Sequence, residues 1–243
     1  KVEEYTKYLR GDMDGLKIGL VRESLEWGAS EPDVSDAVRD ALSKMSEKGA
    51  SVDEVSIPIF KDAPAIWAGI LIHGFAATID SNGDGFGHEG YYNTHWNEFF
   101  GRARKTMSNE FPPLVKVALI TARYLRTEYF GVHHSKAQNL RRLLRQEINK
   151  QFEEYDVLAS PTVPMKPTKL RDTISFKEMA KTGTFMINNT CPFNVTGHPA
   201  ISIPCAMRYN LPIGLQLVAK HFNEGALFHA GFAFEKAFDW RKL

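Results

Sequence analysis

The chain has 243 residues, of which 43% are hydrophobic and 24% are charged, a composition typical of an ordinary globular protein. Its formal net charge of +1 argues against electrostatic binding of nucleic acid or an anionic membrane. No apolar run comes close to the roughly 20 residues that span a bilayer, no signal peptide is visible, and two cysteines do not indicate a disulfide scaffold. We therefore expect a single cytoplasmic domain over residues 1–243.

The first predicted elements are a strand, a helix and a second strand. Residues 16–21 follow an Asp-Gly turn and are mostly apolar, which favours a short strand. Apolar residues recur at helical spacing between Ser35 and Lys48, and Gly49 fits the helix stop. Residues 50–57 alternate between apolar and polar side chains, as in a half-exposed strand. This order predicts two parallel strands joined by a right-handed crossover.

A long apolar segment follows at residues 62–79. Its length and composition predict a buried helix. Trp67 lies on this helix and has two interpretations, plain core packing or one wall of a substrate pocket. His73 is interpreted as a hydrogen-bonded core histidine rather than a metal ligand.

The next segment resembles the first half of a calcium loop. Residues 80–85 place oxygen-bearing side chains at positions 1, 3 and 5 and glycine at position 6, but position 12 is Tyr91 instead of a bidentate Glu. We interpret the segment as a turn stabilised by Asx hydrogen bonds, with ion binding by Asp80 and Asp84 as the alternative. The spacing of four histidines fits no zinc pattern, so we predict no metal site and no cofactor; these are His88, His95, His133 and His134.

Helical segments occupy most of the middle of the chain. Residues 91–107 are expected to form a short helix or an ordered loop, and its aromatic residues Trp96 and Phe99 could contact a second copy in a homodimer. Residues 112–125 and 131–152 have helical periodicity. The second of these carries four basic residues, but it lacks the interleaved aromatic residues of a nucleic-acid platform, so we interpret them as a solvated face.

Residues 155–159 predict a buried strand, and residues 160–164 a loop at its end. Strand-end loops frequently line the site in open α/β sheets. Residues 172–183 are expected to be a polar loop with one helical turn, and residues 188–198 a loop that leads into the last part of the chain.

Two apolar runs near the C-terminus, residues 199–205 and 213–218, predict a hairpin in the centre of a sheet. A Tyr-Asn-Leu-Pro turn signal separates them, and apolar side chains at nearly every position indicate strands buried on both faces. Pro199 and Pro204 are expected to bound the first run. A helix over residues 224–237 ends the predicted structure.

Several of these segments match a known family. Cys191–Ala200, followed by Pro212–Leu217, resembles the C-terminal core of the amidase signature family. Residues 155–162 are similar to the family's buried strand and loop, and residues 136–141 to its preceding "KAQxxR" helix. The resemblance is nearest to the amidases that accompany nitrile-degrading enzymes. It implies an α/β fold, a mixed β-sheet covered by helices on both faces, of which this chain is the C-terminal portion.

The resemblance also implies a mechanism whose residues this sequence lacks. The family hydrolyses amides with a Ser–cis-Ser–Lys triad on a Gly/Ser-rich segment, whereas this chain has no Gly-Ser-Ser-Gly run and no serine followed three positions later by lysine. We therefore assign no catalytic residue and expect the triad on an N-terminal catalytic half outside this chain, so that the 243 residues alone are inactive. A non-catalytic amidase-like scaffold or regulatory binding protein is the alternative.

Ile187 is the leading candidate for substrate contact. In relatives that act on glutaminyl substrates, a loop aspartate and a helix arginine hold the charged amino-acid end, and counting from the shared motifs places these positions on Ile187 and Val117. An apolar wall cannot pair with an ammonium or a carboxylate. The resemblance thus implies hydrolysis of small uncharged aliphatic or aromatic amides to an acid and ammonia, with Ile187 and Trp67 as substrate contacts. The alternative for Ile187 is a core residue without a ligand.

Overall fold

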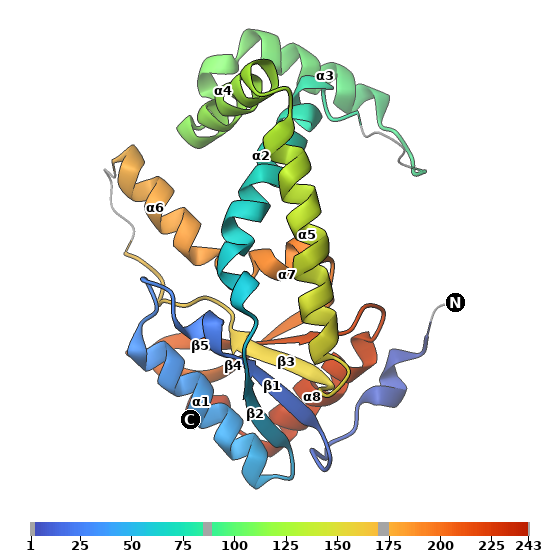
Figure 1. Ribbon diagram of the computed structural model, residues 1–243, viewed down its shortest axis with the longest axis vertical. Helices are drawn as coiled ribbons and strands as arrows, with labels where there is room; N and C mark the ends of the chain where they lie inside the picture. The colour runs from blue at the N-terminus through green and yellow to red at the C-terminus, as the bar shows by residue number, and fades with distance from the viewer. Residues whose placement is uncertain (1–2, 85–88, 170–174, 243) are drawn as a thin grey trace.

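A five-stranded sheet forms the base of the molecule in the computed structural model, which describes residues 3–84, 89–169 and 175–242 (Figure 1). The strand order is β2-β1-β3-β5-β4. β1 runs parallel to both β2 and β3, whereas β5 runs antiparallel to β3 and to β4. The sheet is therefore mixed, as predicted. Its strands are β1 (Lys17–Val21), β2 (Ser51–Val55), β3 (Val157–Pro161), β4 (Ala200–Arg208) and β5 (Leu211–Ala219).

The predicted pair of parallel strands joined by a helix is present in β1, α1 (Pro32–Glu47) and β2. Helix α1 connects the parallel strands β1 and β2. Its buried stripe follows the helical period that the sequence indicates, and its members are Val34, Ala37, Val38, Ala41, Leu42 and Met45. Gly49 adopts a positive φ of 103° just after the helix, which few residues other than glycine adopt at low cost.

The β4–β5 hairpin is present as predicted, but its predicted place in the centre of the sheet is wrong for one strand. β4 lies at the edge of the sheet and three of its nine residues are buried, whereas β5 lies between β3 and β4. Tyr209 and Asn210 form the turn with positive φ values of 53° and 61°, which matches the twist of the two strands. Pro204 does not end the first strand as expected, because β4 continues to Arg208. The register shifts between Pro204 and Ala206, and a bulge on an outer strand tolerates a residue without an N–H donor.

Helices cover both faces of the sheet (Figure 1). Helices α1 and α8 (Glu224–Ala237) pack on one face, around a cluster that includes Leu42, Leu215 and Phe234. The other face carries the lower parts of α2 (Ala63–Asp80) and α5 (Val132–Gln151), together with the short α7 (Cys191–Thr196). The expected two-sided covering is confirmed.

The upper half of the molecule is an arm of helices that rises from the sheet (Figure 1). It contains the far halves of α2 and α5, with α3 (Thr94–Thr106) and α4 (Pro113–Glu128) at its top. The prediction that α2 is a buried helix is wrong for most of its length, because only four of its 18 residues are buried, namely Ala63, Ile66, His73 and Ala76. Beyond the sheet, α2 packs against α4 and α5 and leaves much of its apolar surface open.

The segment Pro58–Asp80 is also long and apolar enough to cross a membrane, by length and composition only. This corrects the expectation that no run approaches that length. Core helices of soluble proteins pass the same test, so the property does not by itself place α2 in a bilayer.

Two segments predicted as loops contain helices. Helix α6 (Phe176–Met186) begins at a capping box, in which the Ser175 side chain accepts the Glu178 backbone N–H and the Glu178 carboxylate accepts the Ser175 N–H. Within the predicted loop 188–198, α7 has Pro192 in its first turn and ends at Gly197, whose φ is 79°. The capping box of α6, and the proline and glycine at the ends of α7, are standard helix-end signals. They were missed because the surrounding residues have the composition of a loop.

Candidate functional site

The two predicted substrate contacts lie against one apolar cluster on the α2–α5–α7 side of the sheet. Trp67 is on α2, and Ile187 is the residue at which α6 ends. Both side chains are partly buried against this cluster, which includes Phe60, Ile66 and Phe193. Val117, which was aligned with the substrate-binding arginine of relatives that act on glutaminyl substrates, lies on α4 and is exposed.

A buried polar network fixes the turn that follows Ile187. The Asn189 side-chain oxygen accepts Trp27 Nε1–H at 2.6 Å, and its amide donates to the carbonyl oxygens of Ser24 at 3.1 Å and Pro161 at 2.8 Å. Gln216 on β5 donates to the Ser160 hydroxyl and to the Asn189 carbonyl, both at 2.9 Å. Because buried polar groups are costly when unpaired, the network holds the α6–α7 turn at the ends of β3 and β5.

A second network fixes the C-terminal end of α7. His198 Nδ1 lies 2.7 Å from the Thr196 hydroxyl, and Nε2 lies 3.0 Å from the Asn149 side-chain oxygen. Arg145 Nε and His221 Nε2 both reach the Thr196 carbonyl oxygen at 2.9 Å. Burial, followed by the proximity of His221 and Arg145, lowers the pKa of His198 to about 3. The ring is therefore neutral at physiological pH and serves as a structural anchor.

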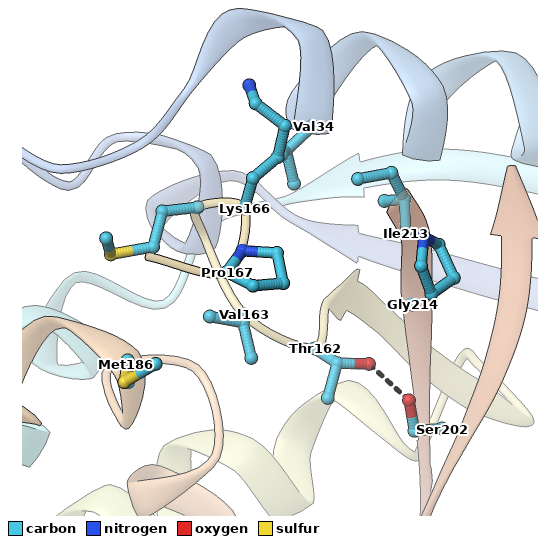
Figure 2. A pocket seen from close by; sticks show the side chains of 11 residues that line it. Val34, Thr162, Val163, Lys166, Pro167, Met186, Ser202, Ile213 and Gly214 are labelled. Atoms are coloured by element: carbon cyan, nitrogen blue, oxygen red, sulfur yellow. Dashed lines mark hydrogen bonds between the residues drawn. The ribbon is translucent and has the colours of Figure 1, made fainter. Parts of the chain in front are cut away.

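A pocket of about 270 Å³ opens where β3, β4 and β5 meet the 162–167 loop (Figure 2). Its walls are mostly apolar, and they come from α1, the loop, the end of α6 and β5. Met186, which lines the pocket, immediately precedes Ile187. The prediction that the loop after β3 lines a site is supported by Thr162 and Val163. The apolar wall residues are Val34, Val163, Met165, Met186, Pro212 and Ile213.

A pair of hydroxyl groups forms the polar part of this pocket. Thr162 Oγ1 and Ser202 Oγ lie 2.6 Å apart, and Gly214 lies beside them on β5 (Figure 2). A Cβ atom at Gly214 would lie 2.8 Å from Thr162 Oγ1 and 2.9 Å from Ser202 Oγ. A side chain at position 214 would therefore displace at least one of the two hydroxyls.

Lys166 joins the 162–167 loop to the start of α1. Its ammonium pairs with Glu31 and Asp33, with Nζ 2.5 Å from the Asp33 carboxylate, and it lies over the Tyr209 ring. The Asp33 and Glu31 carboxylates raise the pKa of Lys166, and the Lys166 ammonium lowers that of Asp33. Ser202, Gly214 and Lys166 were not singled out from the sequence. Ser202 pairs with Gln216 and Gly214 with Pro204, so no local sequence pattern indicates that Ser202 and Gly214 lie side by side.

The structure gives the remaining polar candidates no common site. His73 is buried with its ring 5.2 Å from that of His134, and neither His73 ring nitrogen reaches a hydrogen-bond partner. It is a core residue as predicted, although among the described residues its ring makes no hydrogen bond of ordinary geometry. Asp80 pairs with Arg104 instead of facing an ion, while residues 85–88, with His88, lie outside the described residues. In the three described ranges, no group of three or more His, Cys, Asp or Glu side chains is placed to hold a metal.

Comparison with known families decides the relationship. The family model named Amidase matches residues 1–228. The chain belongs to the amidase family.

This amidase-family chain is 35% identical, over 98% of its length, to a glutamyl-tRNA(Gln) amidotransferase subunit of Halalkalibacterium halodurans, and it covers 48% of that protein. The corresponding subunit of Thermotoga maritima has a solved structure with a TM-score of 0.69 and 26% identity, covering 94% of this chain and 44% of that one. A bacterial aryl acylamidase gives a TM-score of 0.75 at 20% identity, over 99% of this chain and 47% of that one.

The chain thus spans about half the length of the curated relatives it matches. These curated relatives are amidotransferase subunits rather than the nitrile-associated amidases that the motifs suggested. The structural likeness to the acylamidase supports the fold alone.

Membership of the amidase family raises the question of whether Thr162, Ser202 and Lys166 imitate the family's two hydroxyls and lysine. A general base must be neutral and within hydrogen-bond reach of the hydroxyl proton that it takes. Lys166 is instead paired with two carboxylates that raise its pKa. In the part of the chain that the structure describes, no serine hydroxyl is hydrogen-bonded to a lysine amine, so these residues do not form a catalytic triad.

Proposed function

We propose that this chain is the C-terminal portion of an amide hydrolase that acts on small uncharged aliphatic or aromatic amides. The Ser–cis-Ser–Lys triad is supplied by an N-terminal catalytic half outside the 243 residues. Amide hydrolysis needs an activated nucleophile and donors aimed at the developing oxyanion. Family membership, and a length near half that of the relatives, support this division of labour.

The observation that carries the substrate class is the environment of Ile187. It packs against the apolar cluster that Trp67 also contacts, and its neighbour Met186 lines a mainly apolar pocket. A charged substrate end placed against such a wall would lose its hydration without gaining a partner. An uncharged alkyl or aryl group has no charge whose hydration would be lost at this wall. We therefore assign Ile187 and Trp67 to contact with the acyl group.

The complete enzyme is proposed to be cytoplasmic and homodimeric. The dimer is supported by the exposed aromatic residues of α3, where Trp96 and Phe99 are 52% and 68% exposed. Large exposed aromatic groups are enriched at protein interfaces. Sedimentation of the complete enzyme tests this: a single monomeric species at micromolar concentration would contradict it.

The substitution Ile187→Asp in the complete enzyme tests the proposed substrate class. We expect it to lower kcat/KM for benzamide and butyramide about tenfold or more, because a carboxylate would be desolvated beside the acyl group. Ammonia release is the measurement, and Ile187→Leu is the matched control that keeps an apolar side chain. An unchanged kcat/KM for both amides in Ile187→Asp would mean that Ile187 does not contact the acyl group.

The second candidate is a non-catalytic scaffold, which the missing Ser–Lys pair in the described residues favours. The intact mass of the natural protein separates the two. A mass of 27.4 kDa together with no ammonia release would support the scaffold. A mass about twice as large would support the enzyme, since the relatives are about twice this length.

A further inference from the structure

We propose that the pocket beside β5 binds a neutral, mainly apolar small molecule that carries a hydroxyl or primary carboxamide group, and that Thr162 and Ser202 recognise this group. This proposal rests on the proposed function only where it identifies the bound molecule as part of an amide substrate. Binding itself requires neither a triad nor the rest of the enzyme.

The hydroxyl pair can satisfy a group that both donates and accepts a hydrogen bond. The 2.6 Å contact between Thr162 and Ser202 uses one O–H hydrogen, so the other O–H and lone pairs on both oxygens stay available. Both residues line the pocket. A hydroxyl or carboxamide can occupy the remaining donor and acceptor together, whereas a ketone can accept from the donor only and so makes one hydrogen bond fewer.

Gly214 keeps the pair open to the pocket. It contributes no side chain between the two hydroxyls and the cavity, and its carbonyl oxygen accepts the Thr162 N–H at 2.9 Å. That bond fixes the loop against β5, so Thr162 is held in place before any ligand arrives. A preorganised donor and acceptor lose little freedom on binding.

The charges at the pocket favour a neutral ligand. Lys166, the cation in the pocket lining, is already paired with Glu31 and Asp33. The three charges sum to −1, which repels an anion. A cation would lose hydration at the mainly apolar wall, and both carboxylates already pair with Lys166 and do not line the pocket. The volume of about 270 Å³ equals the liquid volume of roughly nine water molecules, which is room for a substituted benzene ring.

Four molecules of nearly equal shape test the chemistry on the 243-residue chain. Benzamide offers a donor and an acceptor, acetophenone only an acceptor, benzoate a negative charge and benzamidinium a positive charge. Titrations followed by NMR should give benzamide the tightest binding. We expect acetophenone to bind about fivefold more weakly, from the loss of one hydrogen bond, and the two ions at least tenfold more weakly.

Methionine methyl signals locate the binding. Met165 and Met186 line the pocket, whereas Met13 and Met45 belong to the core under α1. With methyl-labelled methionine, benzamide should shift the first pair and leave the second pair unchanged. A shift of Met13 and Met45 alone, or of no methyl at millimolar benzamide, would overturn the proposal.

Two variants test the hydroxyl pair directly. Ser202→Ala and Thr162→Val should each weaken benzamide binding about fivefold and leave acetophenone binding nearly unchanged. Thr106→Val is the matched control, since its exposed hydroxyl bonds only the Arg102 carbonyl on α3. Gly214→Ala should abolish selectivity by displacing the pair; if it fails to fold, the Ser202→Ala result stands alone. Equal loss for benzamide and acetophenone would overturn recognition by the hydroxyls.

The outcome is separable from that of the proposed function. If Ser202→Ala weakens benzamide binding but the complete enzyme hydrolyses no amide, the pocket assignment holds and the amidase proposal fails. If the complete enzyme hydrolyses benzamide and the four molecules bind the chain equally, the reverse holds.

Discussion

Asn189 is the residue on which the geometry near Ile187 most depends. It is fully buried and all of its side-chain hydrogen-bonding groups are used, by Trp27, Ser24 and Pro161. Asn189→Ala would leave an indole N–H and two carbonyl oxygens without partners. We expect a loss of about 2–4 kcal/mol in the free energy of unfolding.

Urea denaturation of Asn189→Ala checks this. Asn139→Ala is a suitable control, because Asn139 is exposed on α5 and should change stability by less than about 0.5 kcal/mol. If both variants unfold at the same urea concentration, the network contributes little and the α6–α7 turn is held by apolar packing alone.

His198 should make stability depend on pH. Its pKa is about 3 in the folded state and about 6.5 in the unfolded chain. The unfolded state therefore takes up this proton more readily, so the contribution of His198 is fully present above pH 6.5 and is lost as the pH falls toward 3. Between pH 7 and 3.5, wild type should lose on the order of 4 kcal/mol more than His198→Gln.

Chemical denaturation at several pH values gives this difference, since carboxylates titrate alike in both proteins and cancel. Parallel curves for the two proteins would mean that the His198 ring takes up its proton in the folded state. In that case the contacts to Thr196 and Asn149 would not be stable at acid pH.

At the scale of single residues, the sequence pointed to the loop after β3, which lines the pocket, but to no individual residue of it. The loop after β3 was expected at a site because strand ends gather there. Ser202 could not be identified in this way, because only the pairing of β4 with β5 brings it beside Gly214 and Thr162. Lys166 meets Asp33, 133 positions away in the sequence, and local patterns contain no information on contacts of that range.

At the scale of elements, α6 depends on its cap. None of its residues is buried, so tertiary packing contributes little to its stability, and short isolated helices are marginal in water. Ser175→Ala should cost about 0.5–2 kcal/mol of local stability. Hydrogen exchange of the α6 amides is the measurement, and it should accelerate about three- to thirtyfold. Ser135→Ala on α5, where the hydroxyl bonds only the Gly131 carbonyl, should leave α6 exchange unchanged.

The sequence predicted best those elements whose apolar residues are buried in the sheet or against one of its faces. β5 is apolar on both faces inside the sheet and the stripe of α1 keeps a regular period, so both could be predicted. The edge position of β4 could not, because its apolar run resembles that of a central strand. The helices α6 and α7 were missed because their end signals, Ser175 with Glu178 and Pro192 with Gly197, are short. The exposure of α2 was mispredicted because apolar composition cannot show how many neighbours a helix has.

At the scale of the whole molecule, the arm leaves a row of apolar side chains open to solvent. They recur at helical spacing on one face of α4 and are 40%, 44%, 69% and 54% exposed, for Leu114, Val117, Ile120 and Tyr124 respectively. Contiguous apolar surface binds hydrophobic dyes, whereas single exposed side chains do not. The 243-residue chain should therefore enhance anilinonaphthalene sulfonate fluorescence, and Ile120→Glu should reduce that signal by about half.

The matched control is Phe222→Glu, since Phe222 is 94% exposed but lies outside this row. Its substitution should leave the dye signal nearly unchanged. An equal reduction in both variants would mean that the dye reports scattered apolar residues rather than the α4 face.

The bulge at Pro204 has a consequence for solubility. β4 is the last strand of the sheet, and its first residues include Ala200 and Ser202, which are exposed, so its outer backbone groups could recruit a strand from another molecule. A proline in the middle of Ala-Ile-Ser-Ile-Pro-Cys-Ala interrupts what would otherwise be a seven-residue segment of high amyloid propensity. We therefore expect Pro204 to oppose the addition of further strands at this edge.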